Sequence, residues 1–185
     1  MITVSRFTCI RKEEIFIITG MEDQPSPCCR KKLSVHGTCK RGLKTDSGCA
    51  RMRLRVMECE CGKTHREIPD GIIPYERYSA EMLCAILAGD STDDRPDSTE
   101  EKSIDDILFP TTAKFACDAR MCDKSVRQRI VEWITWFLAY AESIEELRSS
   151  LKSTYNSLSS KLRHYVSVVV NSGRWIQHRM KVPST

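Results

Sequence analysis

Apolar and polar residues alternate with a period of two in the first third of the chain and with a helical period in the last third. The run RMRLRV, from Arg51 to Val56, places arginines on one side and apolar residues on the other. We expect the three arginines to be exposed to solvent and Met52, Leu54 and Val56 to be buried. The turn-forming sequence TDSG at 45–48 precedes it, and KLSVHGTCKRGLK lies before that turn. The pattern predicts a basic β-hairpin, and EIFIIT at 14–19 predicts an earlier strand.

Beyond Pro74 the pattern predicts helices. SAEMLCAILAG indicates a short helix with Ser79 as its N-cap and Gly89 as its stop. Two further short helical pieces are predicted, one from Ser103 and one in TTAKFACDA. Ser143 and Glu146 have the spacing of a capping box, which predicts a helical region to about Asn171, broken near 153–160 and ended by Gly173.

The strongest predicted helix runs from Lys124 to about Tyr140, with Asp123 as its N-cap. Its apolar positions recur at helical spacing, which predicts one buried stripe; they are Val126, Ile130, Trp133, Ile134 and Phe137.

Charge divides the chain further. Residues 28–66 carry 11 Lys and Arg against 3 Asp and Glu, whereas residues 67–110 carry 3 against 12. The stretch DSTDDRPDSTEEKS at 90–103 has no apolar residue and predicts a mobile acidic loop. We therefore expect an α+β protein with two domains, a small zinc-ribbon-like β-hairpin module at 1–73 and an all-helical, helix-turn-helix-like domain at 74–185. The basic segments suggest an anionic partner.

The chain has ten cysteines, and whether they form disulfides depends on the compartment of the protein. The chain has no apolar run of membrane-spanning length and no signal-peptide pattern, so we expect a cytoplasmic protein without membrane association. Disulfides are rare there, and clustered cysteines bind metal or pack as small apolar side chains.

Two cysteine pairs flank the predicted hairpin, Cys28-Cys29 before it and Cys59-Glu60-Cys61-Gly62 after it. A zinc ribbon brings two such turns together so that four thiolates surround one ion. The regular spacing of such a turn, called a knuckle, is C-x-x-C followed by Gly, and neither pair has it. Because the two pairs nevertheless flank a hairpin, we predict four metal ligands, Cys28, Cys29, Cys59 and Cys61. Substitute ligands are Cys39, Cys49, His36 and His65. The alternative is a hairpin of the same shape without metal, in which the cysteines pack.

The stretch CGKTHREIPDGIIPYERYSAE at 61–81 resembles the signature CGKTHRELPxxLxPYKRY of an uncharacterised bacterial family. KSVRQRIVEW at 124–133 and VVNSGRWIQHR at 169–179 are similar to later stretches of that family. The resemblance implies a zinc-ribbon-like domain followed by helix-turn-helix-like helices, with zinc, DNA and an association with transposons. This chain departs from the family at both knuckles.

A helix-turn-helix places the N-terminal residues of its second helix against DNA bases. Here that role falls to the helix from Lys124, whose polar side carries the candidate contacts Lys124, Ser125, Arg127, Gln128 and Arg129. In the hairpin, Arg51, Arg53 and Arg55 are the candidate phosphate contacts. Exposed charges on an ordinary bundle helix are the alternative interpretation.

The leading hypothesis is therefore a DNA-binding protein, regulatory or associated with a mobile element. A protein-interaction adaptor is the first alternative, with the acidic segment binding a basic partner. An enzyme related to nucleases or transposases is the second. The sequence has no glycine-rich phosphate loop, nucleophile elbow or HExxH motif, and we predict no catalytic residue.

Overall fold

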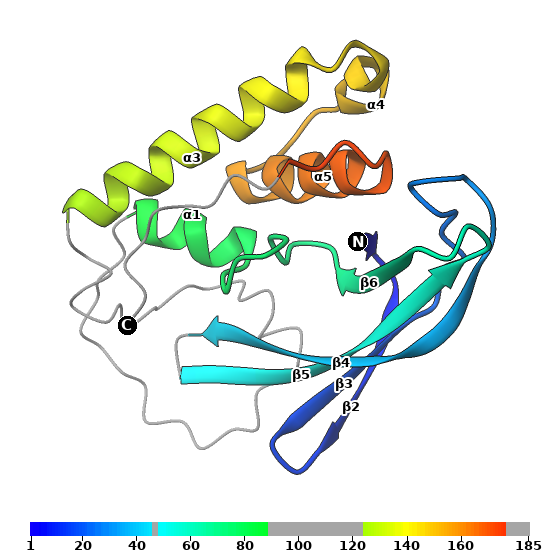
Figure 1. Ribbon diagram of the computed structural model, residues 1–185. Helices are drawn as coiled ribbons and strands as arrows, with labels where there is room; N and C mark the ends of the chain where they lie inside the picture. Colours follow the sequence, from blue (N-terminus) through cyan, green and yellow to red (C-terminus); the bar gives the residue numbers. More distant parts are fainter. Residues whose placement is uncertain (46–47, 89–123, 177–185) are drawn as a thin grey trace.

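The computed structural model describes residues 1–45, 48–88 and 124–176, and it has a sheet layer and a helical layer (Figure 1). The described strands are β1 (Ile2–Val4), β2 (Phe7–Lys12), β3 (Ile15–Gly20), β4 (Leu33–Thr45), β5 (Gly48–Cys59) and β6 (Thr64–Pro69). The described helices are α1 (Ala80–Ala88), α3 (Lys124–Ser143), the 3-10 turn η1 (Glu145–Leu147), α4 (Arg148–Leu151) and α5 (Leu158–Asn171). The predicted α+β class is confirmed.

The described strands form one curled sheet in the order β1-β6-β5-β3-β2, and β4 pairs with the free edge of β5. The β4–β5 pair is the predicted basic hairpin, and its register runs from Leu33 opposite Cys59 to Thr45 opposite Gly48. A bulge at His36, between Val35 and Gly37, shifts the register near the base of this hairpin. The predicted strand at 14–19 is β3, whereas β1, β2 and β6 were not predicted as separate strands.

The other edge of β5 is shared by two strands. β3 pairs in parallel with Arg51–Arg53, and β6 pairs antiparallel with Val56–Glu58. The change of partner occurs near Arg55, whose guanidinium reaches the carboxylate of Glu67 on β6. That carboxylate also accepts a hydrogen bond of 2.9 Å from the backbone N–H of Gly20, the last residue of β3. One buried side chain therefore joins the three strands.

The expectation that all three hairpin arginines are exposed is wrong for Arg55. Arg51 is exposed and Arg53 is half-buried, but Arg55 is bound to Glu67, which is only 2% exposed. Contact with Glu67 raises the pKa of Arg55. The sequence pattern could not show this pairing, because the partner comes from a strand that follows both knuckles.

A core lies between the inner face of the sheet and the segment that follows β6. Met52 and Leu54 are fully buried as predicted, together with Ile18, Leu43, Ile68 and Ile72. Val56, which was expected to be buried with them, is half-buried. Beyond it, Met57 and Cys59 belong to a second small core with Ile2 and Leu33. The sheet thus buries opposite faces at the two ends of β5.

A larger core lies among α1, α3 and α5. All five residues of the predicted stripe on α3 are buried, with exposed fractions of 4% or less; they are Val126, Ile130, Trp133, Ile134 and Phe137. Helix α1 begins as predicted, because Ser79 Oγ accepts a hydrogen bond of 3.1 Å from the N–H of Met82.

The predicted capping box at Ser143 is wrong. Ser143 is the last residue of α3, and its hydroxyl donates to the carbonyl of Tyr140. The chain turns through η1 and α4, whose Leu147 and Leu151 are buried. Helix α5 then begins after Ser157, whose hydroxyl accepts from the N–H of Ser160 at 3.1 Å. The predicted break near 153–160 is confirmed, because α4 ends at Leu151 and α5 begins at Leu158. This turn of the chain lets α5 pack against α3.

The predicted end of α5 at Gly173 is confirmed. Gly173 has φ +77° and donates to the carbonyl of Val170, and Arg174 donates to that of Val169, which is the Schellman arrangement.

The sheet and the helical layer are joined through β1 and α5. The Asn171 side chain accepts from the N–H of Thr3 at 2.8 Å and donates to the carbonyl of Thr3 at 3.1 Å. Arg163 on α5 also contacts Asp70 and Glu81. The proposed domain boundary at 73–74 stays a prediction. Residues 46–47, Gly89, the acidic stretch at 90–103, the two short helical pieces and Asp123 lie outside the described residues.

We predict that Glu67→Gln lowers the free energy of unfolding by about 3 kcal/mol, because it leaves the guanidinium of Arg55 without its buried counter-charge. Urea denaturation followed by circular dichroism measures the change. The control is Glu14→Gln, which removes the exposed contact of 4.0 Å between Glu14 and Arg51 and should cost less than about 0.5 kcal/mol. Equal effects of the two substitutions would contradict the assignment.

Candidate metal centre

The first cysteine pair lies on a tight loop between β3 and β4. The N–H of Ser26 donates to the carbonyl of Lys31 at 2.9 Å, and the N–H of Arg30 donates to the carbonyl of Ser26 at 2.9 Å. Arg30 has φ +60°, a left-handed conformation that glycine adopts more easily. The loop therefore makes the sharp turn of a knuckle although no glycine follows Cys29.

The second pair lies on the turn from β5 to β6. The N–H of Cys59 donates to the carbonyl of Lys63 at 3.0 Å, and the N–H of Gly62 donates to the carbonyl of Cys59 at 2.8 Å. Gly62 has φ +78° and open space where a Cβ would stand. The two turns thus share the same outline, with two backbone hydrogen bonds and one left-handed residue in each.

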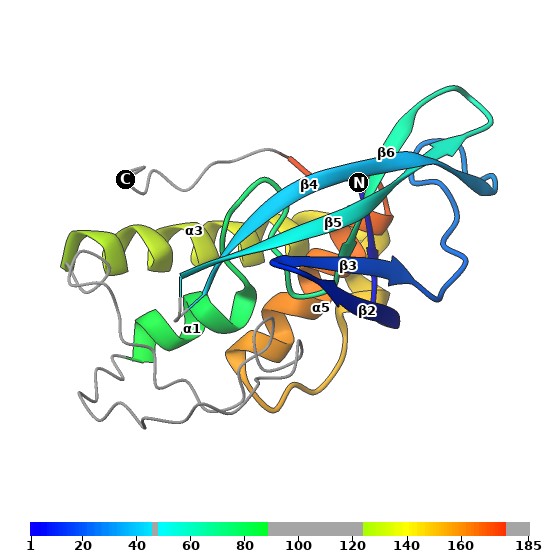
Figure 2. The same cartoon turned by 90° about the horizontal axis from the view of Figure 1, so that it is seen from below.

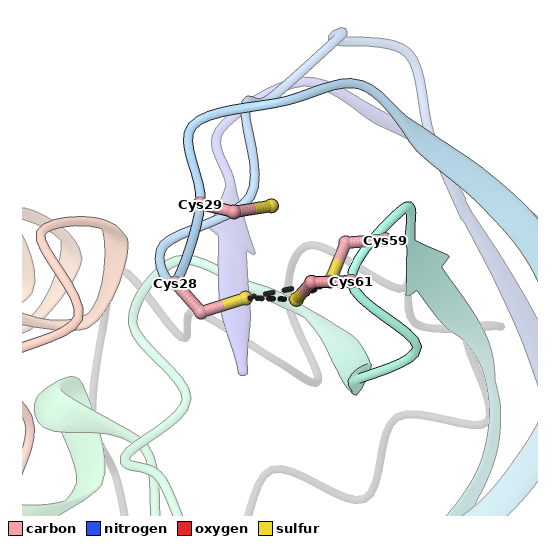
Figure 3. Close-up of side chains that lie close together, drawn as sticks. All are labelled: Cys28, Cys29, Cys59 and Cys61. Carbon is pink, nitrogen blue, oxygen red and sulfur yellow. Dashed lines mark hydrogen bonds between the residues drawn. The ribbon is translucent and has the colours of Figure 1, made fainter.

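The two turns face each other, and their four cysteines form one cluster (Figure 3). Cys28 Sγ lies 3.4 Å from Cys59 Sγ and 3.4 Å from Cys61 Sγ, and the last two sulfurs lie 2.9 Å apart. All four sulfurs, including that of Cys29, are within 4.8 Å of one another. Four sulfurs at about 2.3 Å from a tetrahedral ion stand about 3.8 Å apart, so the cluster has the size of such a site.

Contacts between the thiols change their acidity. The contact with Cys61 is the main cause that lowers the pKa of Cys59 to about 5, and the same contact raises the pKa of Cys61 to about 12. The backbone N–H of Lys31 lowers the pKa of Cys29. These contacts favour the thiolate form at Cys59, and thiolate is the form that binds metal ions.

Two neighbouring side chains contact Cys28. Ser26 Oγ lies 2.9 Å from Cys28 Sγ, and His65 Nε2 lies 3.4 Å from it. His65 is buried and comes from β6. Ser26 was not predicted to belong to this site. The sequence signal was available, because Ser26 stands three residues before Cys29, where a regular knuckle has its first cysteine.

The other predicted substitute ligands lie elsewhere. His36, at the bulge of β4, contacts the carboxylate of Glu58 at 3.1 Å. Cys39 packs against the inner core of the sheet, and Cys49 is exposed near the tip of the hairpin. The described residues therefore offer one cluster of candidate metal ligands, made of the four cysteines predicted first.

The first knuckle also contacts the end of α5. The guanidinium of Arg30 donates to the carbonyl of Asn171 at 3.2 Å, which places a positive charge at a helix C-terminus. A Cβ on Gly173 would stand 2.6 Å from the carbonyl oxygen of Pro27, so only glycine fits there. The cluster is thus fixed to the helical layer as well as to the sheet.

The candidate DNA-contacting residues occupy two separate surfaces. The hairpin arginines lie on β5, whereas α3 lies on the far side of the helical layer (Figure 1). On α3, Gln128 is exposed and donates to the carboxylate of Glu132 at 3.0 Å, and Arg127 and Arg129 are half-buried. Lys124 and Ser125 begin this helix, and their side chains lie outside the described part of the chain.

Fold and cluster together define an α+β protein with a candidate four-cysteine metal site. Residues 26–107 match the family model of a domain of unknown function, DUF6431. The match spans both knuckles, the β4–β5 hairpin, β6 and α1, and it covers less than half of the chain. Comparisons with curated proteins and with solved structures found no match.

The matched family is of unknown function, so zinc, DNA binding and the association with transposons stay predictions. Within the described residues, no helix combines the length and the apolar character needed to cross a membrane.

We predict that Gly173→Ala destabilises the protein more than Gly62→Ala. Both substitutions force a left-handed residue, which costs about 1–2 kcal/mol. Only the first also drives a Cβ into the backbone of Pro27. Urea denaturation of the two variants, prepared under identical metal conditions, measures the difference. Similar losses would show that the knuckle and α5 are not in close contact.

Proposed function

We propose that this protein binds nucleic acid, with DNA as the leading candidate. We also propose that a zinc ion, held by Cys28, Cys29, Cys59 and Cys61, stabilises the fold that presents the binding surface. The zinc is structural in this proposal, and the outer face of the sheet makes the main contact. The observation that carries the proposal is the group of cations at the outward positions of β4 and β5, namely Lys40, Arg51 and Arg53, whose rows across the sheet contain no Asp or Glu.

The donor set supports zinc. Four clustered thiols suit zinc or iron better than magnesium, calcium or manganese, which prefer oxygen ligands. Four protein ligands fill the coordination sphere and leave no position for water or substrate, as in structural zinc sites. His65 beside Cys28 is suited to donate a hydrogen bond to a bound thiolate, the kind of outer contact that orients metal ligands.

The charges on the hairpin support an anionic partner. Lys40 on β4 stands directly opposite Arg53 on β5 in the antiparallel register, and Arg51 follows on the same face. Like charges in opposed positions destabilise a sheet, so a protein gains from an anion that binds between them. Nucleic acid supplies a row of phosphates, and most of its contacts with proteins are made to such groups.

Helix α3 is a second proposed contact. Exposed Gln128 has the amide chemistry that reads adenine, and Arg127 and Arg129 stand beside it in the sequence. The rest of the exposed side of α3 carries Glu132 and Glu142 and no basic residue, so a phosphate contact there is limited to the first turns. The helix-turn-helix interpretation needs a preceding helix between 89 and 123, outside the described residues.

We predict one zinc per chain when the protein is purified without added metal, as measured by plasma mass spectrometry. Cys59→Ser should lower the zinc content several-fold, because it removes one of the four thiolates. Cys49→Ser is the matched control, since Cys49 is exposed and lies outside the cluster, and it should keep the full content. Iron in place of zinc, or equal zinc content in both variants, would contradict the proposal.

We predict that the chain binds a labelled mixed-sequence oligonucleotide, single-stranded or annealed to its complement, with strong salt dependence in fluorescence anisotropy. The double substitution Lys40→Ala and Arg53→Ala should weaken binding and reduce the slope of log affinity against log salt by about 2, because two phosphate contacts are lost.

The control for this experiment is Lys152→Ala, which removes an exposed cation after α4 and should leave the slope unchanged. Absence of binding to both forms of the oligonucleotide would refute the proposed function.

A further inference from the structure

The outer face of the sheet has two kinds of columns, and the strand registers define them. In one row across four strands, Ile10 on β2 stands beside Ile17 on β3, then Arg53 on β5 and Lys40 on β4. In the next row, Lys12 stands beside Ile15, then Arg51 and Gly42. Isoleucines therefore line β3 and part of β2, and cations line β5 and β4.

This face is the side of the sheet turned away from the helices. Figure 2 views the sheet from below, with the helices behind it. The residues that alternate with these rows, among them Ile18, Met52, Leu54 and Leu43, are buried in the inner core. By contrast Ile10 is 58% exposed, and Lys12, Lys40 and Arg51 are exposed.

The cations on this face have little internal compensation. The outward positions of β2, β3, β4 and β5 in these rows contain no Asp or Glu. Glu14, in the turn between β2 and β3, reaches Arg51 at 4.0 Å, but both side chains are more than 70% exposed, and such a pair is weak. Arg55 lies on the same face two residues beyond Arg53, and its charge is already neutralised by Glu67.

We infer that this face binds single-stranded nucleic acid, with phosphates along β4 and β5 and bases on the isoleucines of β2 and β3. The inference rests on the nucleic-acid binding proposed above and names the form of the ligand. The residues that it adds are Ile10, Lys12, Ile15, Ile17 and Lys40.

The reason is the pairing of a cationic column with an apolar column. Neighbouring strands are about 4.8 Å apart, so Ile17 and Arg53 are within reach of one nucleotide. A duplex presents phosphates outward and keeps its base faces stacked inside, so it has nothing apolar to place on Ile10 and Ile17. An unpaired strand has phosphates on one side and open base faces on the other, which matches both columns.

Isoleucine gives base faces an apolar surface without aromatic stacking. No aromatic residue stands in these outward rows, since Phe7 and Phe16 pack toward the inner core. The contact should therefore tolerate different bases, and its strength should depend on how the apolar column is filled. This gives a test by gain of binding, in which unfolding of the variant cannot mimic the result.

The experiment uses the full chain with its zinc content verified, and it measures fluorescence anisotropy with three probes. They are a 15-nucleotide thymidine strand, a mixed-sequence duplex of the same length, and an abasic strand with the same phosphates. We expect the thymidine strand to bind about tenfold more tightly than either other probe. Equal binding of the abasic strand, or preference for the duplex, would overturn the inference.

Two variants test the apolar column. Ile10→Trp places an aromatic ring at an exposed strand position and should tighten thymidine-strand binding about tenfold, with little change for the abasic strand. Ile10→Ser should weaken it severalfold. Val35→Ser is the matched control, because Val35 is 59% exposed on β4 but lies outside these rows, and it should have no effect.

These outcomes separate the two proposals. If the duplex binds with the expected salt dependence and Ile10→Trp changes nothing, the inference of a single strand is wrong and nucleic-acid binding stands. If none of the three probes binds, the proposed function itself is wrong and the inference falls with it.

Discussion

The sheet depends on the carboxylate of Glu67. Along one edge, β5 pairs first with β3 and then with β6. Such a junction leaves backbone groups unpaired and a gap between the ends of β3 and β6. Glu67 fills the gap by accepting from the backbone of Gly20 and from two nitrogens of Arg55. A Cβ on Gly20 would stand 2.6 Å from an oxygen of this carboxylate, so a side chain at this position would displace Glu67 from the junction. The same junction sets the position of the second knuckle, which lies between β5 and β6.

The elements that local pattern predicted are those whose partners are near in sequence. The alternation at 51–56 identified the β4–β5 hairpin, and the spacing of apolar residues from Val126 to Phe137 identified the buried side of α3. Strand β6 was missed because its two buried faces remove the alternation: His65 and Glu67 are buried on one face and Ile68 on the other. Strand β1 was missed because three residues carry no period.

The candidate site was predictable in its residues and not in its arrangement. Two cysteine pairs on either side of a hairpin identified the four thiols, and the structure brings them together although neither pair has regular spacing. What local sequence could not show is the compensation. Ser26 and Glu58 stand where regular knuckles have cysteines, while Cys28 and Cys59 reach the same centre from neighbouring positions. The ion pair of Arg55 with Glu67 could not be predicted for a similar reason, since Glu67 lies twelve residues away on another strand.

The contacts between Thr3 and Asn171 span 168 positions of the sequence. During synthesis, the cysteines of both knuckles leave the ribosome long before Asn171 does, so a metal ion could join β4, β5 and β6 while α5 is still unmade. The groups of β1 and of the first knuckle that contact Asn171 then stay hydrated until α5 has been synthesised. Closing so long a loop is entropically costly and slows folding. Early capture of metal by the two knuckles would reduce that cost, because the surface that receives α5 would already be assembled.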